Sequence, residues 1–315
     1  MLPFCKRKDK GKSNENQMKI YPSVEEIKEK YQSFKTVPVS TEIEADVSAL
    51  TVLKKLKNVS SHCYMLESND DANNTGRYTF LGYDPKAEVS CTNNNVRVID
   101  SFGVKNYTGD PRKYIKQMLD EHKAPKIENL PTFTGGLVGY FDYVKYSEQS
   151  LKLDAHDDGN FKDVDLMLFD KVIAFDNREN KIILIVNIQT QDVDENYAIA
   201  LKELEIMKNI ILNGDEAEIE KPKLKTEFKP LFDGERYAKM VEKAKHYIKE
   251  GDIFQVVLSN RLEAEMDGSL FGTYEILRKL NPSPYMFYFS SDDIEMAGAS
   301  PETLVKLENG KLSTY

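Results

Sequence analysis

The chain has 315 residues, of which 40% are hydrophobic and 30% are charged, and its formal net charge is −9. These values are typical of a soluble globular protein with one large domain or two smaller ones. The acidic net charge argues against a nucleic-acid or anionic-membrane partner, because phosphates need a basic face. In addition, no apolar run approaches the ~20 residues of a membrane span.

The cysteines and the N-terminal residues indicate the cellular compartment. Cys5, Cys63 and Cys91 are scattered and odd in number, which favours a reducing cytoplasm over a disulfide framework or a zinc site. The histidines are far apart in sequence and give no metal-binding spacing. Residues 1–20 are polar and lysine-rich and lack the apolar core of a signal peptide, so a disordered tail is expected there.

The first half of the chain is predicted to alternate short helices and strands. A capping box of Ser23 and Glu26 begins a helix over 22–31, and Asp110 followed by Pro111 begins another. Apolar periodicity predicts further helices at two places, 49–56 and 194–212. Strands are expected at 62–67, 78–82, 87–91, 96–100, 166–175 and 181–188. The glycines at 135, 136 and 139 are not followed by Gly-Lys-Ser/Thr, so they are interpreted as close packing in a strand.

The second half begins with a charged, proline-containing stretch that has no periodicity. Residues 214–231 are therefore predicted to link a domain over 21–213 to a second domain that starts at 232. The elements expected beyond it are helices over 233–250 and 270–280 and strands over 253–259, 285–289 and 294–299. Asn309-Gly310 predicts a final hairpin turn. Hairpin-joined strands with helices between them indicate an α+β fold with antiparallel sheets.

The segment 281–288, N-P-S-P-Y-M-F-Y, is unusual because two prolines lead directly into an aromatic strand. Each proline fixes φ and removes a backbone donor, and the residue before it is pushed toward extended conformations. An extended backbone with free polar groups beside an apolar wall suits a small amino acid. The alternative is a proline-led strand at a sheet edge.

This segment and Met65-Leu66-Glu67-Ser68 together resemble the anthranilate synthase large-subunit (component I) family of chorismate-binding enzymes. The resemblance runs from about residue 21 to 315 and includes the segments at 76–82, 135–140 and 251–259. It implies a β-sandwich of two mainly antiparallel sheets with helices outside, incomplete at the C-terminus. In that family the two segments line the site of the feedback inhibitor tryptophan. The tryptophan contacts it implies are Ser68, Pro284, Tyr285 and Met286, with Glu67 and Arg77 nearby.

The resemblance also implies a reaction and its partners. Ammonia released from glutamine by an amidotransferase subunit adds to chorismate, and loss of hydroxide and pyruvate gives anthranilate, the first step of tryptophan biosynthesis. The expected assembly has two large and two small subunits. Magnesium is expected as cofactor because a hard cation binds the carboxylates of chorismate.

Two residues of the chain carry candidate catalytic roles. Glu302, in Ser300-Pro301-Glu302, matches the family's acid for the leaving hydroxide; the alternative is a turn with a solvated carboxylate. Gln255 interrupts an apolar run and is expected to be a buried amide. Isochorismate and salicylate synthases carry at this position a lysine that can activate water. Glutamine cannot take a proton, so Gln255 favours amination over hydration.

The last strand begins at Lys311 and the sequence ends within it, so a longer enzyme is expected. In the family the catalytic histidine and the metal-binding carboxylates lie further on. No metal ligand is therefore assigned here, and the chain alone is expected to make no anthranilate. Two alternatives stay open: aminodeoxychorismate synthase component I, and a catalytically incomplete tryptophan-binding fragment.

Overall fold

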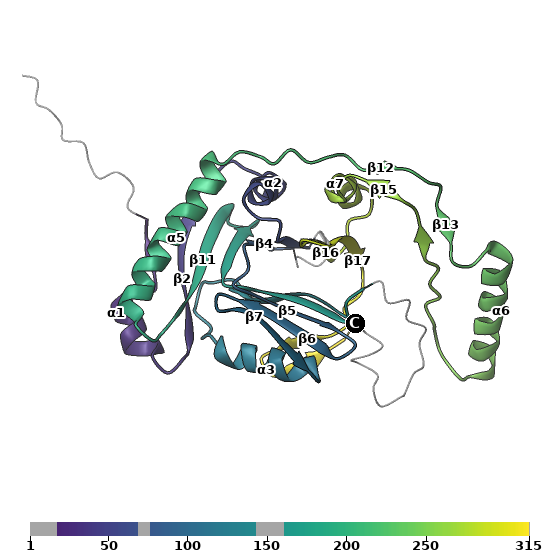
Figure 1. Cartoon of the computed structure of the whole chain (residues 1–315), viewed down its shortest axis with the longest axis horizontal. Coiled ribbons are helices and arrows are strands. Elements are labelled where there is room, and N and C mark those ends of the chain that lie inside the picture. Colours follow the sequence, from purple (N-terminus) through teal and green to yellow (C-terminus); the bar gives the residue numbers. More distant parts are fainter. Residues whose placement is uncertain (1–17, 69–75, 143–160, 315) are drawn as a thin grey trace, which may run out of the picture.

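Two antiparallel sheets organise the chain in the computed structural model, which describes residues 18–68, 76–142 and 161–314 (Figure 1). The larger has eight strands in the order β1-β2-β11-β10-β4-β3-β16-β17. Its strands are β1 Ile20–Tyr21, β2 Thr36–Ile43, β3 Cys63–Glu67, β4 Tyr78–Tyr83, β10 Lys171–Asp176, β11 Lys181–Gln189, β16 Tyr285–Ser290 and β17 Glu295–Ser300. With its helices, this arrangement confirms the predicted α+β class.

The smaller sheet has five strands in the order β7-β6-β5-β9-β8. They are β5 Ala87–Thr92, β6 Asn95–Asp100, β7 Gly103–Thr108, β8 Gly136–Phe141 and β9 Val164–Phe169. The glycines of β8 allow a close approach to β9, because a Cβ on Gly139 would lie 1.9 Å from the carbonyl oxygen of Asp165. This confirms the interpretation of the glycine-rich segment as strand packing.

The helices begin where the sequence places capping side chains. Ser23 accepts a hydrogen bond from the Glu26 amide and Asp110 accepts one from the Arg112 amide, so the two predicted N-caps are confirmed. Asp233 caps a third helix by accepting from the Arg236 amide. The helices are α1 Val24–Glu26, the π-helix η1 Ile27–Tyr31, α2 Ala49–Val59, α3 Pro111–Glu121, α5 Val193–Asn213, α6 Gly234–Glu250 and α7 Phe271–Leu280. In the described residues no helix is long and apolar enough to cross a membrane.

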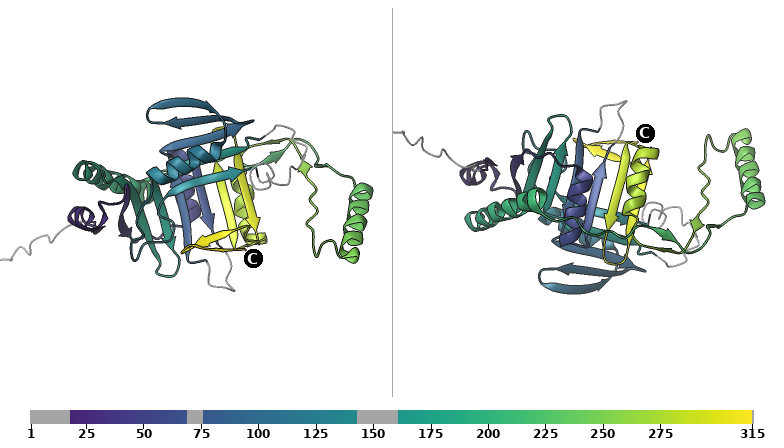
Figure 2. Two further views of the ribbon diagram at one scale, coloured as in Figure 1. Left: turned by 90° about the horizontal axis from the view of Figure 1, so that it is seen from below. Right: turned by 90° about the horizontal axis from the view of Figure 1, so that it is seen from above.

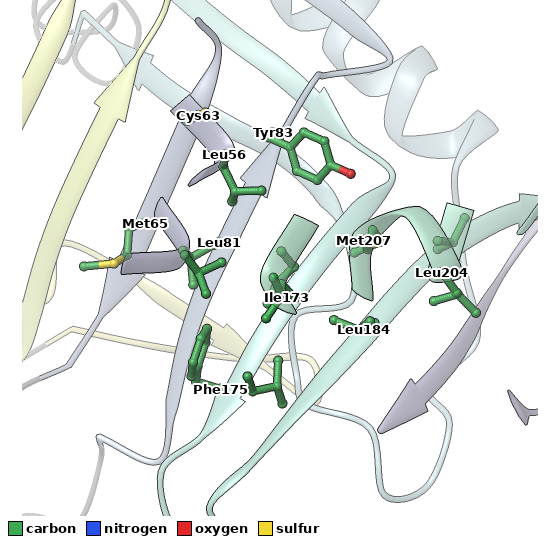
Figure 3. Packing of buried hydrophobic residues seen from close by; sticks show 14 of the residues in the cluster. Leu56, Cys63, Met65, Leu81, Tyr83, Ile173, Phe175, Leu184, Leu204 and Met207 are labelled. Carbon is green, nitrogen blue, oxygen red and sulfur yellow. The ribbon is translucent and has the colours of Figure 1, made fainter. Parts of the chain in front are cut away.

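The main core lies between the eight-stranded sheet and the helices on one of its faces (Figure 3). Leu56 of α2 and Leu204 and Met207 of α5 pack against alternate residues of the strands, including Leu81 and Leu184. Helix α7 adds Phe271 and Tyr274 to the same core. A separate cluster joins α3 to the five-stranded sheet through Ile115, Val89 and Val98.

A third cluster is shared by the two sheets. Tyr64 and Phe289 come from the eight-stranded sheet, and Met167 and Phe169 from the five-stranded one. The rings of Tyr64 and Phe169 meet edge to face at 4.7 Å. Gly82, opposite Tyr64 in the ladder, leaves room for this ring, because a Cβ there would lie 2.2 Å from it.

Tyr64 supplies a first prediction about stability. Its hydroxyl is fully buried and has no hydrogen-bond partner among the described residues. An unpaired buried hydroxyl costs about 1–3 kcal/mol. Tyr64→Phe is therefore expected to raise the free energy of unfolding by about 1 kcal/mol, measured by urea denaturation. A loss of stability would mean that the hydroxyl has a partner in solution.

The predicted strand over 166–175 is wrong as a single element. The chain leaves the five-stranded sheet after Phe169 and enters the eight-stranded sheet at Lys171, so β9 and β10 belong to different sheets. Asp170 lies at the crossing, where its carbonyl accepts hydrogen bonds from the Asn187 amide at 2.8 Å and the Asn187 side chain at 3.1 Å. The unbroken apolar run hides this change of sheet, because both strands are buried.

Strands β2 and β7 are among those that the sequence did not predict. Strand β2 contains Pro38, which is disfavoured within sheets. Pro38 pairs with Asn187 of β11, whereas β1 reaches only Ser40 and Thr41, so the proline faces no neighbour on that side. Strand β7 is exposed throughout and lacks an apolar pattern.

The residues between α5 and α7 form an arm at one side of the molecule, with α6 at its far end (Figure 1). Two short ladders pair its outgoing and returning segments: β12 Lys223–Leu224 with β15 Met266–Asp267, and β13 Lys229–Pro230 with β14 Leu262–Glu263. The predicted strand over 253–259 is wrong, because this segment is extended but unpaired and Phe254 is fully exposed. Helix α6 ends at Gly251 as predicted, and none of its residues is buried.

The boundary regions also bear on the predicted domains. Of the predicted tail, residues 1–17 lie outside the described residues, and Ile20 pairs with Thr41, so the tail prediction is too long. The predicted domain boundary at 214–231 stays a prediction. Strands β16 and β17, which follow it in the sequence, lie in the eight-stranded sheet together with strands that precede it. The last hairpin, β18 Lys306–Glu308 and β19 Lys311–Ser313, turns at Asn309 and Gly310, both with positive φ as predicted.

Candidate functional site

The two segments singled out in the sequence are neighbours in space. Strand β16 lies between β3 and β17, and Met286 pairs with Glu67 on one side and with Ala299 on the other. In Figure 2 the yellow strands of the C-terminal part lie beside the blue strands of the N-terminal part in one sheet. Segments far apart in the sequence thus form one surface.

A cavity of ≈330 Å³ lies where these segments meet. Its volume is near the lower limit of the ~300–1,000 Å³ of small-molecule pockets. The lining residues come from the end of β3, from β4, from the loop before β8 and from the start of β16: Leu66, Glu67, Ser68, Tyr78, Phe80, Thr132, Pro284, Tyr285, Met286 and Phe287. Four of the predicted contacts, Ser68, Pro284, Tyr285 and Met286, are among them.

Aromatic rings form much of the cavity wall. Tyr78 and Phe80 have ring centroids 5.7 Å apart, and Phe80 meets Phe133 edge to face at 5.6 Å. The Phe287 ring lies over Gly298, where a Cβ would be 2.4 Å from it. Such a wall suits an apolar or aromatic ligand with one polar end, since Ser68 supplies a hydroxyl beside these rings.

The side chain of Glu67 bonds to two residues of helix α7. Its carboxylate is buried, accepts a hydrogen bond from the Tyr274 hydroxyl at 2.6 Å, and forms a bidentate ion pair with Arg278. Burial and the neighbouring carboxylate raise the pKa of Tyr274, so this tyrosine is a neutral donor. Burial lowers the pKa of Arg278, but its bonds to Glu67 outweigh burial and raise it overall. Glu67 therefore fixes α7 to β3.

The opposite end of α7 is held by a second carboxylate of the sheet. Glu295 of β17 accepts hydrogen bonds from the Leu270 amide at 2.7 Å and from the Ser269 hydroxyl at 2.8 Å, and Lys57 lies 3.1 Å away. Burial raises the pKa of Glu295, but these bonds and one from Tyr288 lower it overall. Because both ends of α7 are fixed, the segment that follows it starts from a defined position.

Arg77 does not line the cavity. Its guanidinium forms a bidentate pair with the buried Asp176 of β10, at distances of 2.7–3.2 Å, and stacks over the Tyr78 ring 4.8 Å from the centroid. Burial raises the pKa of Asp176, but hydrogen bonds from Arg77 and from backbone amides lower it overall. Arg77 thus stacks on Tyr78, which lines the cavity, without lining the cavity itself. Its predicted place near the ligand stays a prediction.

The candidate catalytic residues lie in different settings. Glu302 is exposed in the turn that follows β17, next to Thr303, whose hydroxyl bonds to that of Tyr285. Gln255 lies on the exposed, unpaired segment after α6, so the expectation of a buried amide is wrong. The apolar neighbours of Gln255 suggested burial, but in this structure they are exposed as well. The roles of both residues stay predictions.

Tyr274 and Arg278 are the functional side chains that sequence reasoning missed. Their spacing of four residues places them on one face of a helix, which signals a shared partner. The partner lies 207 residues from Tyr274, so the sequence alone does not identify it. Tyr78 and Phe80 were recognised as strand residues, but not as a cavity wall.

Other cavities have less suitable linings. One of ≈770 Å³ beside β1 and β2 is lined by four glutamates, Glu42, Glu44, Glu128 and Glu179, and by two lysines. Another of ≈460 Å³ lies on a polar face of the five-stranded sheet near Arg97 and Lys162. Among the described residues, no group of three or more His, Cys, Asp or Glu could hold a metal ion.

Comparison with known proteins identifies relatives of the chain. Anthranilate synthase component 1 of Acetivibrio thermocellus is 33% identical over 306 residues, and that of Aquifex aeolicus is 34% identical over 310. Each match covers 94% of this chain and 62% of the relative, so the chain spans about three fifths of their length.

A solved structure is also similar. The crystal structure of anthranilate synthase component I from Streptococcus pneumoniae TIGR4 matches with a TM-score of 0.55 and 28% identity, over 75% of this chain and 53% of that one. The profile of the chorismate binding enzyme family matches residues 61–315. That range contains both segments of the cavity as well as the turn with Glu302, and the chain belongs to the chorismate binding enzyme family.

Proposed function

We propose that the chain is part of an anthranilate synthase large subunit and carries its tryptophan cavity. The observation that carries this proposal is the ≈330 Å³ cavity in which Ser68, Pro284 and Tyr285 meet beside aromatic rings. A hydroxyl suits the amino-acid head, and the rings suit an indole. The names of the relatives support the same assignment.

The proposed reaction converts chorismate and ammonia into anthranilate, pyruvate and water. Glu302 protonates the ring hydroxyl as it leaves, so that it departs as water, and the exposed position of Glu302 leaves it accessible for this role. Gln255 offers no basic atom to activate water, so ammonia is the nucleophile. Magnesium would bind the carboxylates of chorismate; among the described residues, no group of three or more His, Cys, Asp or Glu could hold it.

The proposed partner is a glutamine amidotransferase subunit that supplies ammonia, in an assembly of two large and two small subunits. Cys63 and Cys91 are buried and are not joined in a disulfide, which supports a cytoplasmic location. The proposed complete architecture is a sandwich of the two sheets, supported by the cluster that they share.

The exposed arm supports a further part of this proposal. Phe254 is 100% exposed, Val257 84% and Leu262 60%, and α6 has no buried residue. Large apolar side chains with exposures this high suit a surface that another part of a protein covers. We therefore propose that more polypeptide packs on the arm in the active enzyme and completes the chorismate site.

Aminodeoxychorismate synthase component I remains the second candidate, since it shares the substrate and the nucleophile. The cavity favours anthranilate synthase, because a feedback site for tryptophan belongs to the tryptophan pathway. The product separates the two: anthranilate is aromatic and fluorescent, whereas aminodeoxychorismate retains the enolpyruvyl group. Formation of the second product would overturn the assignment.

Ser68→Arg tests the cavity directly. The arginine side chain would fill space in the cavity, so tryptophan affinity is expected to fall at least about tenfold, which corresponds to about 1.4 kcal/mol. Titration calorimetry with the purified chain measures this, and Ser101→Arg, in the exposed turn between β6 and β7, is the matched control. Equal affinity in wild type and Ser68→Arg would contradict the assignment of the cavity.

A further inference from the structure

The segment that carries Glu302 begins where the β16–β17 ladder ends. Tyr285 and Ser300 form the last pair of this ladder. After it come Pro301, which has no amide donor, and the exposed Glu302. Backbone pairing therefore does not fix the position of Glu302, and any positioning has to come from side chains.

Three side-chain hydrogen bonds hold the segment that follows the last backbone pair of β16 and β17. The buried Ser283 hydroxyl donates to the carbonyl oxygen of Ser300. The hydroxyls of Tyr285 and Thr303 bond to each other, and the Ser300 hydroxyl donates to the Glu302 carbonyl at 3.3 Å. Glu302 is thus held between two anchored residues, one on each side of it.

Tyr285 is also part of the cavity wall, as is its neighbour Pro284. Tyr285 therefore lines the cavity, and its hydroxyl contacts the segment that carries Glu302. We infer that Ser283 and Tyr285 are positioning residues that orient Glu302 through Ser300 and Thr303, and that a ligand in the cavity acts on Glu302 through Tyr285. The second half of this inference rests on the proposed tryptophan cavity and on the proposed role of Glu302.

The physical basis is the sensitivity of proton transfer to geometry. A displacement of about 1 Å in a reacting group can cost about 10²-fold in rate. A carboxylate on an unpaired turn samples many positions unless its neighbours are fixed. A ligand that shifts the Tyr285 ring must change the bond to Thr303, and this gives the cavity a direct effect on the acid.

Tyr285→Phe is the central variant, because it keeps the ring in the cavity and removes only the hydroxyl. Thr303→Val removes the partner of the same bond. Tyr78→Phe is the matched control, since Tyr78 also lines the cavity but has no bond to the Glu302 segment. Hydrogen exchange of a peptide covering 300–305 and tryptophan calorimetry are measured for each protein.

In the absence of ligand, exchange in this peptide is expected to be about two- to tenfold faster in Tyr285→Phe and Thr303→Val, the effect of losing one hydrogen bond. Ser283→Ala is expected to act in the same direction, and Tyr78→Phe to match wild type. Exchange at the wild-type rate in both Tyr285→Phe and Thr303→Val would overturn the positioning role.

In wild type, adding tryptophan is expected to change the hydrogen-exchange rate of the same peptide. Tyr285→Phe is expected to bind tryptophan within about twofold of the wild-type affinity. In this variant, however, the exchange rate of the peptide should not respond to tryptophan. In an active form of the enzyme, Tyr285→Phe should then bind tryptophan yet be less inhibited by it, which a merely structural role does not predict. An equal change of exchange in wild type and Tyr285→Phe would overturn the coupling. Absence of tryptophan binding in wild type would overturn the proposed cavity and the coupling, whereas the ligand-free comparison would still decide the positioning role.

Discussion

Replacing Glu302 with glutamine is expected to lower anthranilate formation by about 10²–10⁴-fold, the usual contribution of a positioned general acid. Glutamine keeps the shape of the side chain but cannot supply a proton to the leaving hydroxide. The assay follows anthranilate fluorescence with chorismate, magnesium and excess ammonium, in a protein that spans the full length of its relatives.

The matched control is Glu308→Gln, which removes an exposed carboxylate of the neighbouring β18–β19 hairpin. It is expected to leave turnover unchanged. If Glu302→Gln lost less than about tenfold in turnover while chorismate binding persisted, the acid would have to be another group. A change in the Michaelis constant alone would assign Glu302 to substrate binding.

Arg278→Met is expected to cause the largest loss of stability. It leaves the Glu67 carboxylate, whose side chain is 2% exposed, without its cation. Breaking a buried ion pair from one side costs about 3–5 kcal/mol, and the lower value, about 3 kcal/mol, applies because Arg278 is partly exposed. Urea denaturation measures the change in the free energy of unfolding.

Two further variants isolate the buried pair. Lys54→Met breaks the pair between Lys54 of α2 and Glu275 of α7, where both side chains are partly exposed, and is expected to cost less than about 1 kcal/mol. Combining Arg278→Met with Glu67→Met removes both charges and should restore much of the lost stability. Equal effects of Arg278→Met and Lys54→Met would show that Glu67 is solvated and that α7 is not fixed through it.

Much of the fold could be predicted because local chemistry determines it. Ser23 and Asp110 cap helices as predicted, and Asn309-Gly310 forms its turn, since each feature depends on a few neighbouring residues. The predictions that are wrong concern elements whose structure depends on residues far away in the sequence. The apolar run over 166–175 contains a change of sheet that is not visible without the neighbouring strands, and the run over 253–259 has no strand beside it.

The candidate site could also be predicted only in part from the sequence. The sequence indicated that Glu67, Ser68 and Met286 belong together, and the β3–β16 pairing unites them. It did not indicate the direction of each side chain, which alternates along a strand. Glu67 and Met286 are buried against the helices, whereas Leu66 and Phe287 lie on the opposite face of the sheet.

The insertion of β16 between β3 and β17 has a consequence for folding kinetics. Strands β3 and β16, which pair Glu67 with Met286, must meet before the cavity exists, and contacts between residues so far apart in the sequence slow folding. The cavity is therefore expected to form late, and a ligand that needs both strands would bind only the native state. At a concentration about 100 times its dissociation constant, such a ligand adds about 2.7 kcal/mol of stability. Because it binds after the transition state, this stability slows unfolding and lengthens the lifetime of the folded protein.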